Sequence, residues 1–139
     1  MSASEAFFDT NVLIYQFSED ASKVAISENL LRVGGVISVQ VLNEFASVGL
    51  RRLGLDWVVV RDILQEFRGG LSVAPLTVET HERGLDLAER YSLNVYDGMI
   101  VAAAQLAGCT VLYSEDMHDG LVIDALTIRN PFRQPQGDG

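Results

Sequence analysis

The sequence has little of what a disulfide-stapled, secreted or membrane-spanning protein needs. It holds one cysteine, Cys109, so no disulfide can form within the chain, and a single thiol is typical of a reducing compartment. No apolar run reaches the roughly 20 residues of a membrane span, and residues 1–5 lack the basic and apolar regions of a secretion signal. We therefore expect a cytoplasmic protein with no membrane association.

Positive charge is also scarce. Ten basic residues stand against 19 acidic ones, which gives a formal net charge of −9, and Lys23 is the only lysine. This balance disfavours the basic face with which many proteins bind nucleic acids. Because clustered carboxylates need something to neutralise them, two explanations remain: bound cations, or an acidic surface that serves solubility.

The chain does contain ample material for one hydrophobic core, since 48% of its 139 residues are hydrophobic. We expect a single domain at residues 1–132 and a flexible tail at residues 133–139. Short apolar runs, typical of strands buried on both faces, alternate with segments of helical periodicity. Strands are expected at residues 6–8, 36–37, 71–75, 111–113 and 126–128, and helices at 12–17, 23–31, 39–53, 57–67, 78–91 and 97–108. This order predicts an α/β fold: a three-layer α/β/α sandwich around a mostly parallel sheet of four to five strands.

Four acidic residues occupy corresponding places in this pattern. Asp9 directly follows the first strand, Asp97 opens the alanine-rich helix, and Asp116 follows the strand at 111–113. Glu44 lies one to two turns into a helix that starts at the same edge of the sheet. Ligands of parallel α/β folds bind beyond the carboxyl ends of the strands. Each acid alone could be a helix cap or a loop residue, but their shared placement favours a common site.

Convergent carboxylates suit the hydrolysis of a phosphodiester bond. This reaction needs an activated water and stabilised charge on the phosphate and the leaving oxygen, which one or two Mg²⁺ or Mn²⁺ ions can supply. These ions prefer hard oxygen ligands. Thr10 and Ser114 place hydroxyls beside the acids, and Asn11 could orient Asp9 by hydrogen bonding.

Two other classes of α/β protein fit the sequence less well. A phosphoacceptor receiver domain needs a lysine after its last strand, whereas Lys23 precedes all strands but the first. An aspartate-nucleophile phosphatase begins with Asp-x-Asp, whereas Asn11 occupies the second of these positions after Asp9.

The segments around the four acids resemble the motifs of PIN domains, particularly those of VapC-type toxin ribonucleases. The likeness runs over residues 5–132, and its first and third motifs are the most specific. The four segments are DTNVLIY at residues 9–15, NEF at 43–45, YDGMIVAAA at 96–104 and LYSEDM at 112–117.

The resemblance implies a Mg²⁺- or Mn²⁺-dependent endoribonuclease, the toxin of a type II toxin–antitoxin pair. It implies an RNA substrate, a homodimer and a cognate antitoxin that wraps the helices near the site. It also makes Asp9, Glu44, Asp97 and Asp116 the catalytic and metal-binding set. A catalytically degenerate PIN-fold module that acts only through a protein partner is the alternative.

Three positions near these motifs leave choices open. The fourth motif of the family is variable, so Asp119 could replace or assist Asp116, and Glu115 is a further candidate. Many relatives have alanine where Gly98 stands, which implies that this difference is a small one.

Cutting an acidic polymer with an acidic protein calls for positive charge near the cleaved bond. Arg51 and Arg52 stand at the end of the helix that carries Glu44 and could contact flanking phosphates. The same two residues could instead complement the dipole of that helix.

Overall fold

The computed structural model describes residues 5–133, and in this part of the chain six strands form one sheet. Their order is β3-β2-β1-β4-β6-β5, and all neighbours pair in parallel except β5 and β6. The prediction of a mostly parallel sheet is confirmed, but four to five strands was too few. The strands are β1 (Phe7–Phe8), β2 (Val36–Ser38), β3 (Ser72–Ala74), β4 (Val111–Tyr113), β5 (Val122–Ile123) and β6 (Leu126–Arg129).

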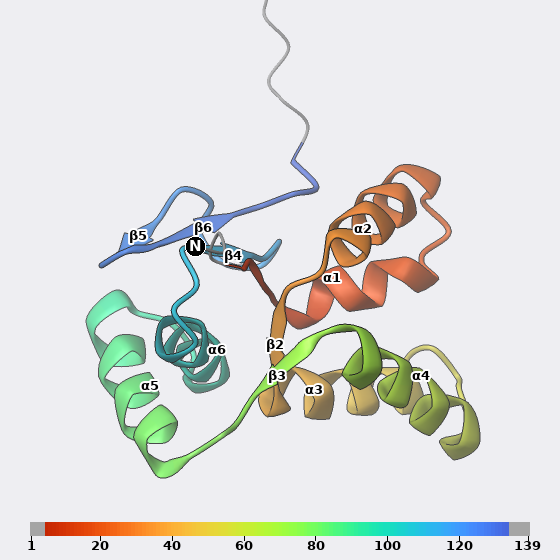
Figure 1. The fold of residues 1–139 in the computed structure, drawn as a ribbon, viewed down its shortest axis with the longest axis horizontal. Helices are drawn as coiled ribbons and strands as arrows, with labels where there is room; N and C mark the ends of the chain where they lie inside the picture. Colours follow the sequence, from red (N-terminus) through yellow and green to blue (C-terminus); the bar gives the residue numbers. More distant parts are fainter. Residues whose placement is uncertain (1–4, 134–139) are drawn as a thin grey trace, which may run out of the picture.

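Helices cover both faces of the sheet, as predicted. In Figure 1, α5 and α6 lie together on one side, whereas α1, α2, α3 and α4 lie on the other. Within residues 5–133 no helix is both long and apolar enough to cross a membrane. The helices are α1 (Thr10–Ile14), α2 (Ala21–Val33), α3 (Val39–Arg51), α4 (Trp57–Gly70), α5 (Val78–Tyr91) and α6 (Val95–Leu106), with a 3₁₀ turn, η1 (Tyr15–Phe17), after α1.

The core lies between the sheet and these two helix layers. Four residues from four adjacent strands, Phe7, Ile37, Leu112 and Ile128, are fully buried in it.

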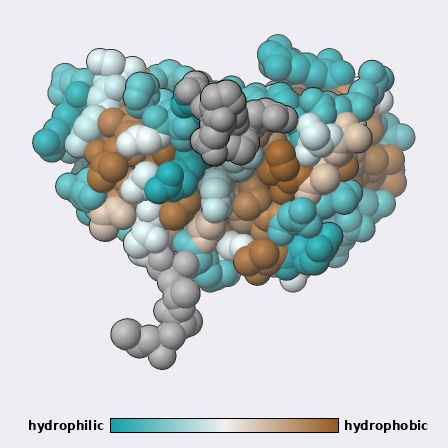
Figure 2. All heavy atoms as spheres, turned by 90° about the horizontal axis from the view of Figure 1, so that it is seen from above, coloured by the Kyte–Doolittle hydropathy of each residue, from teal (hydrophilic) through white to brown (hydrophobic). Residues whose placement is uncertain are grey.

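The surface seen from above carries separate hydrophobic areas between hydrophilic ones (Figure 2). An apolar groove of about 450 Å³ runs between α2 and the sheet. Its walls include Phe8, Leu30, Val33 and Val111.

The sheet register determines which loop residues become neighbours. β1 lies between β2 and β4, and Phe8 is opposite Tyr113. The next residues along the two strands, Asp9 and Ser114, therefore emerge side by side at the carboxyl edge. On the other side of β1, β2 leads directly into α3, because Ser38 caps that helix by accepting a hydrogen bond from the Val41 amide.

Close packing of α5 on α6 fixes the start of α6. A Cβ atom added to Gly98 would lie 2.3 Å from the carbonyl oxygen of Gly84 and 3.0 Å from the Cβ of Ala88. The backbones of the two helices leave no room for a methyl group there. Treating alanine at position 98 as a small change was therefore wrong for this chain.

The end of the described chain turns back onto the domain. Phe132 packs edge-on against Tyr15, with ring centroids 4.6 Å apart. Arg133 forms an ion pair with Asp119 at 3.0 Å. The predicted tail at residues 133–139 lies outside the described residues apart from Arg133.

Candidate metal centre

Asp9 sits at the carboxyl end of β1 and caps α1. Its Oδ1 accepts a hydrogen bond from the Thr10 amide at 2.7 Å, and its Oδ2 accepts one from Ser114 Oγ at 2.7 Å. The side chain is buried, with 4% of its surface exposed. Burial raises the pKa of Asp9 to about 7, against the lowering effect of these hydrogen bonds and with a further increase from Asp97 and Glu44. A buried carboxylate with no cation beside it is costly, so this group is poised to take up a proton or a metal ion.

Glu44 reaches the same place from α3. Thr10 Oγ1 donates a hydrogen bond to Glu44 Oε2 at 2.8 Å. Thr10 thus binds two of the four acids, one through its amide and one through its hydroxyl. The structure thus places the Thr10 hydroxyl beside the acids, in contact with Glu44.

Asp97 lies in the first turn of α6, but it does not open the helix as predicted. Asn94 is the N-cap, and its Oδ1 accepts a hydrogen bond from the Asp97 amide at 2.8 Å. Asn94 Nδ2 in turn donates to Asp97 Oδ2 at 3.1 Å. Burial, with Glu44 and Asp116 as further causes, raises the pKa of Asp97 to about 6. Because Asn94 supplies the cap, the Asp97 carboxylate is left to face the other acids.

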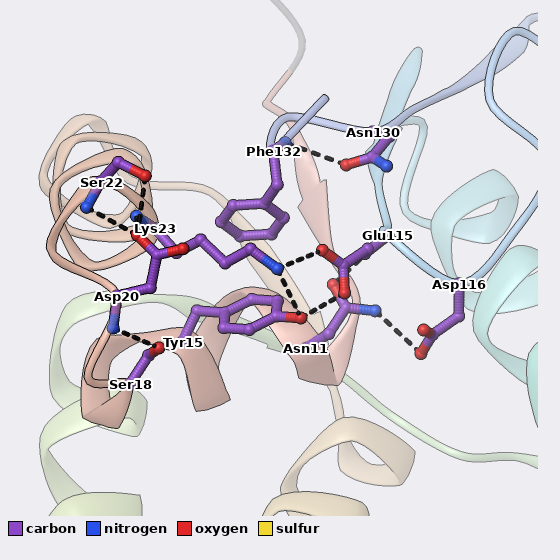
Figure 3. Close-up of polar contacts among 10 residues, drawn as sticks. All are labelled: Asn11, Tyr15, Ser18, Asp20, Ser22, Lys23, Glu115, Asp116, Asn130 and Phe132. Carbon is purple, nitrogen blue, oxygen red and sulfur yellow. Dashed lines mark hydrogen bonds and ion pairs between the residues drawn. The ribbon is translucent and has the colours of Figure 1, made fainter. Parts of the chain in front are cut away.

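Asn11 joins the fourth acid to the first. Its Nδ2 donates to Asp116 Oδ2 at 3.2 Å and to Asp9 Oδ2 at 3.4 Å. Its Oδ1 accepts a hydrogen bond from the Glu115 amide at 3.2 Å. Figure 3 shows Asn11 pointing toward the loop that carries Glu115 and Asp116. One amide side chain therefore sets the spacing between the end of β1 and the loop after β4.

The four acids line a single pocket of about 270 Å³, together with Thr10, Asn11 and Arg52. Within residues 5–133, however, no three acidic, histidine or cysteine side chains stand as a ready-made group that could hold a metal ion. The hydrogen bonds explain this, because each acid is turned toward a neutral donor of its own. The donor set nonetheless fits a hard divalent cation: it offers carboxylate oxygens, and burial together with neighbouring acids raises the pKa of Asp9 and of Asp97.

The less certain candidates divide into one pocket residue and three that lie elsewhere. Arg52 lines the pocket, whereas its neighbour Arg51 does not. Glu115 points away from the pocket and pairs with Lys23 at 3.0 Å. Asp119 accepts hydrogen bonds from the Asn130 amide and from Arg133, and it does not line the pocket that contains Asp116. It lies in the loop between β4 and β5, and its two hydrogen-bond partners belong to the chain after β6.

Sequence reasoning missed two polar groups around the site. Asn94 escaped notice because Asp97, three residues later, was itself taken as the cap; an asparagine three residues before an acid is a usable capping signal. Ser47 also lines the pocket, one turn after Glu44 on α3. Only the helical spacing of the two residues could have indicated it.

Several solved structures share this fold, whereas no match to a curated protein is found. A toxin–antitoxin complex from Klebsiella pneumoniae aligns at a TM-score of 0.67 and 22% identity, covering 93% of this chain and 99% of that one. DNA-bound VapBC from Salmonella typhimurium gives 0.67 and 19%, with the same coverage. VapC20 from Mycobacterium tuberculosis, described as a toxin that cleaves the sarcin-ricin loop, gives 0.66 and 18%, covering 80% and 89%.

These likenesses establish the fold, and the sequence itself gives the family. The model of the PIN domain family matches residues 6–118, which contain all four acids and the elements that carry them. The chain belongs to the PIN domain family, and its fold is that of VapC-type toxins.

Proposed function

We propose that this protein is a metal-dependent endoribonuclease that hydrolyses RNA phosphodiester bonds with one or two Mg²⁺ or Mn²⁺ ions. One observation carries the proposal: four carboxylates from four separate segments line one pocket, and two of them have strongly raised pKa values. Perturbed carboxyls that converge in a pocket are a common mark of a functional site. Membership of the PIN domain family and the fold shared with a toxin described as cleaving the sarcin-ricin loop support the same reading.

Asp9, Glu44, Asp97 and Asp116 are the residues that would hold the metal. When bound, such an ion lowers the pKa of water and stabilises charge on the phosphate and the leaving oxygen. The protein's part is to orient the carboxylates and to hold the substrate. Asn11 donates to Asp9 and Asp116 and so fixes their separation.

Hydroxyl groups complete this orientation. Ser114 Oγ and Thr10 Oγ1 each donate to one of the acids, Asp9 and Glu44, and hold one of its oxygens in place. Ser114 is fully buried, so its hydrogen bond to Asp9 is protected from water.

Arg52 is the basic group that lines the pocket, and we assign it to a phosphate of the bound RNA. Arg51, outside the pocket lining, is left with the flanking phosphates or with the dipole of α3. Arg52 is the C-cap of α3, and within residues 5–133 its guanidinium forms no ion pair. An overall charge of −9 then matters less, because binding depends on the charge at the pocket once the acids are neutralised.

We further propose that the chain is the toxin of a type II toxin–antitoxin pair, acts in the cytoplasm as a homodimer and is neutralised by an antitoxin. Solved neighbours from Klebsiella pneumoniae and Salmonella typhimurium are described as toxin–antitoxin or VapBC complexes. Trp57 and Val58, at the start of α4, are 63% and 70% exposed. Adjacent large apolar side chains on a surface favour a protein partner.

The test is cleavage of total cellular RNA by the purified protein, with Mn²⁺ and with a chelator. Discrete fragments are expected from wild type only with metal, and none from Asp97→Asn. Asp86→Asn is the matched control, because it removes the same charge from an exposed position on α5. Cleavage that persists in Asp97→Asn or in chelator would contradict the proposal.

A binding measurement separates the enzyme from the alternative, a degenerate PIN-fold module. The chain's acids form no ready metal-holding group as they stand in residues 5–133, which is the observation that favours a module. Millimolar Mn²⁺ is expected to raise the melting temperature of wild type but not of Asp9→Asn, since binding to the native state alone stabilises it. No shift in wild type, together with no cleavage, would support the module.

A further inference from the structure

The only lysine of the chain lies in a cluster of side chains beside the acidic pocket, not on open surface. Lys23 Nζ donates to Glu115 Oε2 at 3.0 Å and to the Tyr15 hydroxyl at 3.1 Å, and lies 4.3 Å from the centre of the Tyr15 ring. The Tyr15 hydroxyl donates to Glu115 Oε1, and Phe132 packs on Tyr15. We call Lys23, Tyr15, Glu115 and Phe132 the Lys23 cluster (Figure 3).

The Lys23 cluster joins three segments that are far apart in the sequence. Tyr15 and Lys23 come from η1 and α2, Glu115 from the loop after β4, and Phe132 from the chain after β6. The Phe132 amide donates to Asn130 Oδ1 at 2.9 Å, which fixes the ring over the others. The Lys23 and Glu115 side chains are only 29% and 26% exposed. Partial burial and an added tyrosine hydrogen bond make this pair better defined than an open surface ion pair.

Glu115 stands between two residues of the candidate metal centre. Ser114, before it, donates to Asp9 at 2.7 Å, and Asp116, after it, accepts from Asn11 at 3.2 Å. The Glu115 amide itself donates to Asn11 Oδ1. Holding the Glu115 side chain outside the pocket therefore constrains the backbone that places Ser114 and Asp116.

We propose that Lys23 is a positioning residue for the metal centre: through Glu115 and Tyr15 it fixes the loop that carries Ser114 and Asp116 against Asp9. The proposal rests on the proposed function in that it assigns a metal to this centre. Lys23 itself does not line the pocket. Its effect is transmitted through the loop, in the way that residues behind metal ligands orient those ligands.

Charge and position predict opposite results when Lys23 is replaced. Removing a positive charge near four carboxylates should, by Coulomb's law alone, strengthen the binding of a cation. Releasing the loop should weaken it, because Asp116 is no longer held near the other acids. The sign of the change in Mn²⁺ affinity therefore separates the two effects.

The experiment measures Mn²⁺ binding by calorimetry to wild type, Lys23→Met, Tyr15→Phe and Arg32→Met. Affinity is expected to fall on the order of tenfold in Lys23→Met, and also to fall in Tyr15→Phe, which changes no charge. Arg32→Met is the matched control, since it removes one positive charge from an exposed position on the same helix, and it should bind as wild type does. Lys23→Arg should recover part of the loss by keeping the pair with Glu115.

Kinetics give a second reading of the same proposal. For RNA cleavage, Lys23→Met should lower kcat and leave KM nearly unchanged, since Lys23 is outside the pocket. A rise in KM alone would identify Lys23 as a substrate contact and overturn the positioning role. Unchanged or tighter Mn²⁺ binding by a folded Lys23→Met protein would also overturn it.

Hydrogen exchange keeps this inference separate from the proposed function. The amides of Glu115 and Met117 donate to Asn11 Oδ1 and Ser114 Oγ, and both should exchange faster in Lys23→Met than in Arg32→Met, without metal or RNA. If wild type neither bound Mn²⁺ nor cleaved RNA, the proposed function would fail. The exchange rates would then still decide whether Lys23 holds the loop, and equal rates in the two variants would reject it.

Discussion

Asp9 and Asp119 are the same kind of side chain in the same small domain, yet their surroundings differ in every respect that matters for charge. Asp9 is buried among neutral donors and faces Asp97 and Glu44, and its pKa is raised to about 7. Asp119 is partly exposed, and its hydrogen bonds from the Asn130 amide and from Arg133 lower its pKa. The protein therefore pairs the charge of Asp119 with its own Arg133, whereas the charge of Asp9 is left in need of a cation.

This difference distinguishes acids that hold the fold from acids that are available for chemistry. Asp119 ties the loop after β4 to the end of β6, and Glu115 ties that loop to α2 through Lys23. The pocket carboxylates, in contrast, receive hydrogen bonds that orient them without cancelling their charge. An acidic chain is thus explained region by region, and the unneutralised charge is concentrated where a metal would bind.

The largest effect on RNA cleavage is expected when the two candidates for the fourth acid, Asp116 and Asp119, are each replaced by asparagine. Asp116→Asn should lower RNA cleavage by roughly 100-fold or more, because even residues behind metal ligands commonly contribute 10- to 100-fold. Asp119→Asn removes the same charge three residues away and should leave cleavage unchanged. Initial rates of both variants at saturating Mn²⁺ make the comparison; equal losses would mean that Asp119 belongs to the site after all.

The pH dependence of the free energy of unfolding should distinguish Asp9 from Asp119 most directly. The raised pKa of Asp9 favours its protonated form in the folded state, so its contribution to wild-type stability is lost as pH rises from about 4 through about 7. Asp9→Asn has no such loss. In chelator, its free energy of unfolding should exceed that of wild type by on the order of 4 kcal/mol at pH 8 and by little at pH 4.

Urea unfolding at a series of pH values provides this measurement. Asparagine keeps the capping role of Asp9, so the start of α1 should be preserved. A stability difference that did not change between pH 4 and pH 8 would mean that Asp9 is not destabilised by its charge.

Gly98→Ala should disturb the acidic pocket indirectly, by displacing the helix that carries Asp97. The added methyl group would meet the Gly84 carbonyl at 2.3 Å and push the start of α6, with Asp97, away from α5. We expect a loss of about 1–3 kcal/mol in stability and a fall in cleavage. Gly69→Ala is the control: that helical position has nothing within 4 Å, so alanine should stabilise by up to about 1 kcal/mol. Thermal melts with unchanged midpoints for both would contradict this account of the packing.

The smallest effect on stability is expected at Asp119, which pairs with Arg133. Asp119→Asn should lower the free energy of unfolding only slightly at neutral pH, as is usual for a partly exposed ion pair. Since folding lowers the pKa of Asp119, the stability that this residue contributes is present above the ordinary value of 3.8. It is lost as the pH falls below 3.8 and through the lowered pKa of the folded state. The difference from wild type should therefore shrink at pH 3, the reverse of the trend for Asp9→Asn.

The parts of this molecule that local chemistry dictates could be predicted from the sequence. Thr77 caps α5, and the predicted helix at 78–91 has the bounds that the structure shows. The convergence of Asp9 and Ser114 followed from parallel strands alone, because residues after neighbouring strands emerge at one edge. Membership of the PIN domain family was likewise visible in the motifs around the acids.

What escaped prediction depends on contacts between distant segments. β5 has two residues and is formed by pairing with β6 through a turn at Asp124, whose φ is +54°. The need for glycine at position 98 comes from Gly84 on another helix, and the role of Asp119 comes from Arg133 at the end of the described chain. No periodicity in the sequence reports such pairs.

Having a single lysine gives the molecule an unusual chemical simplicity. An amine-directed reagent meets one side-chain target in the whole chain, and that target is in contact with Glu115 and Tyr15. Its rate of labelling is then a measure of how often α2 and the loop after β4 separate. The acylation rate of the Lys23 side chain thus reports how often this side of the pocket opens.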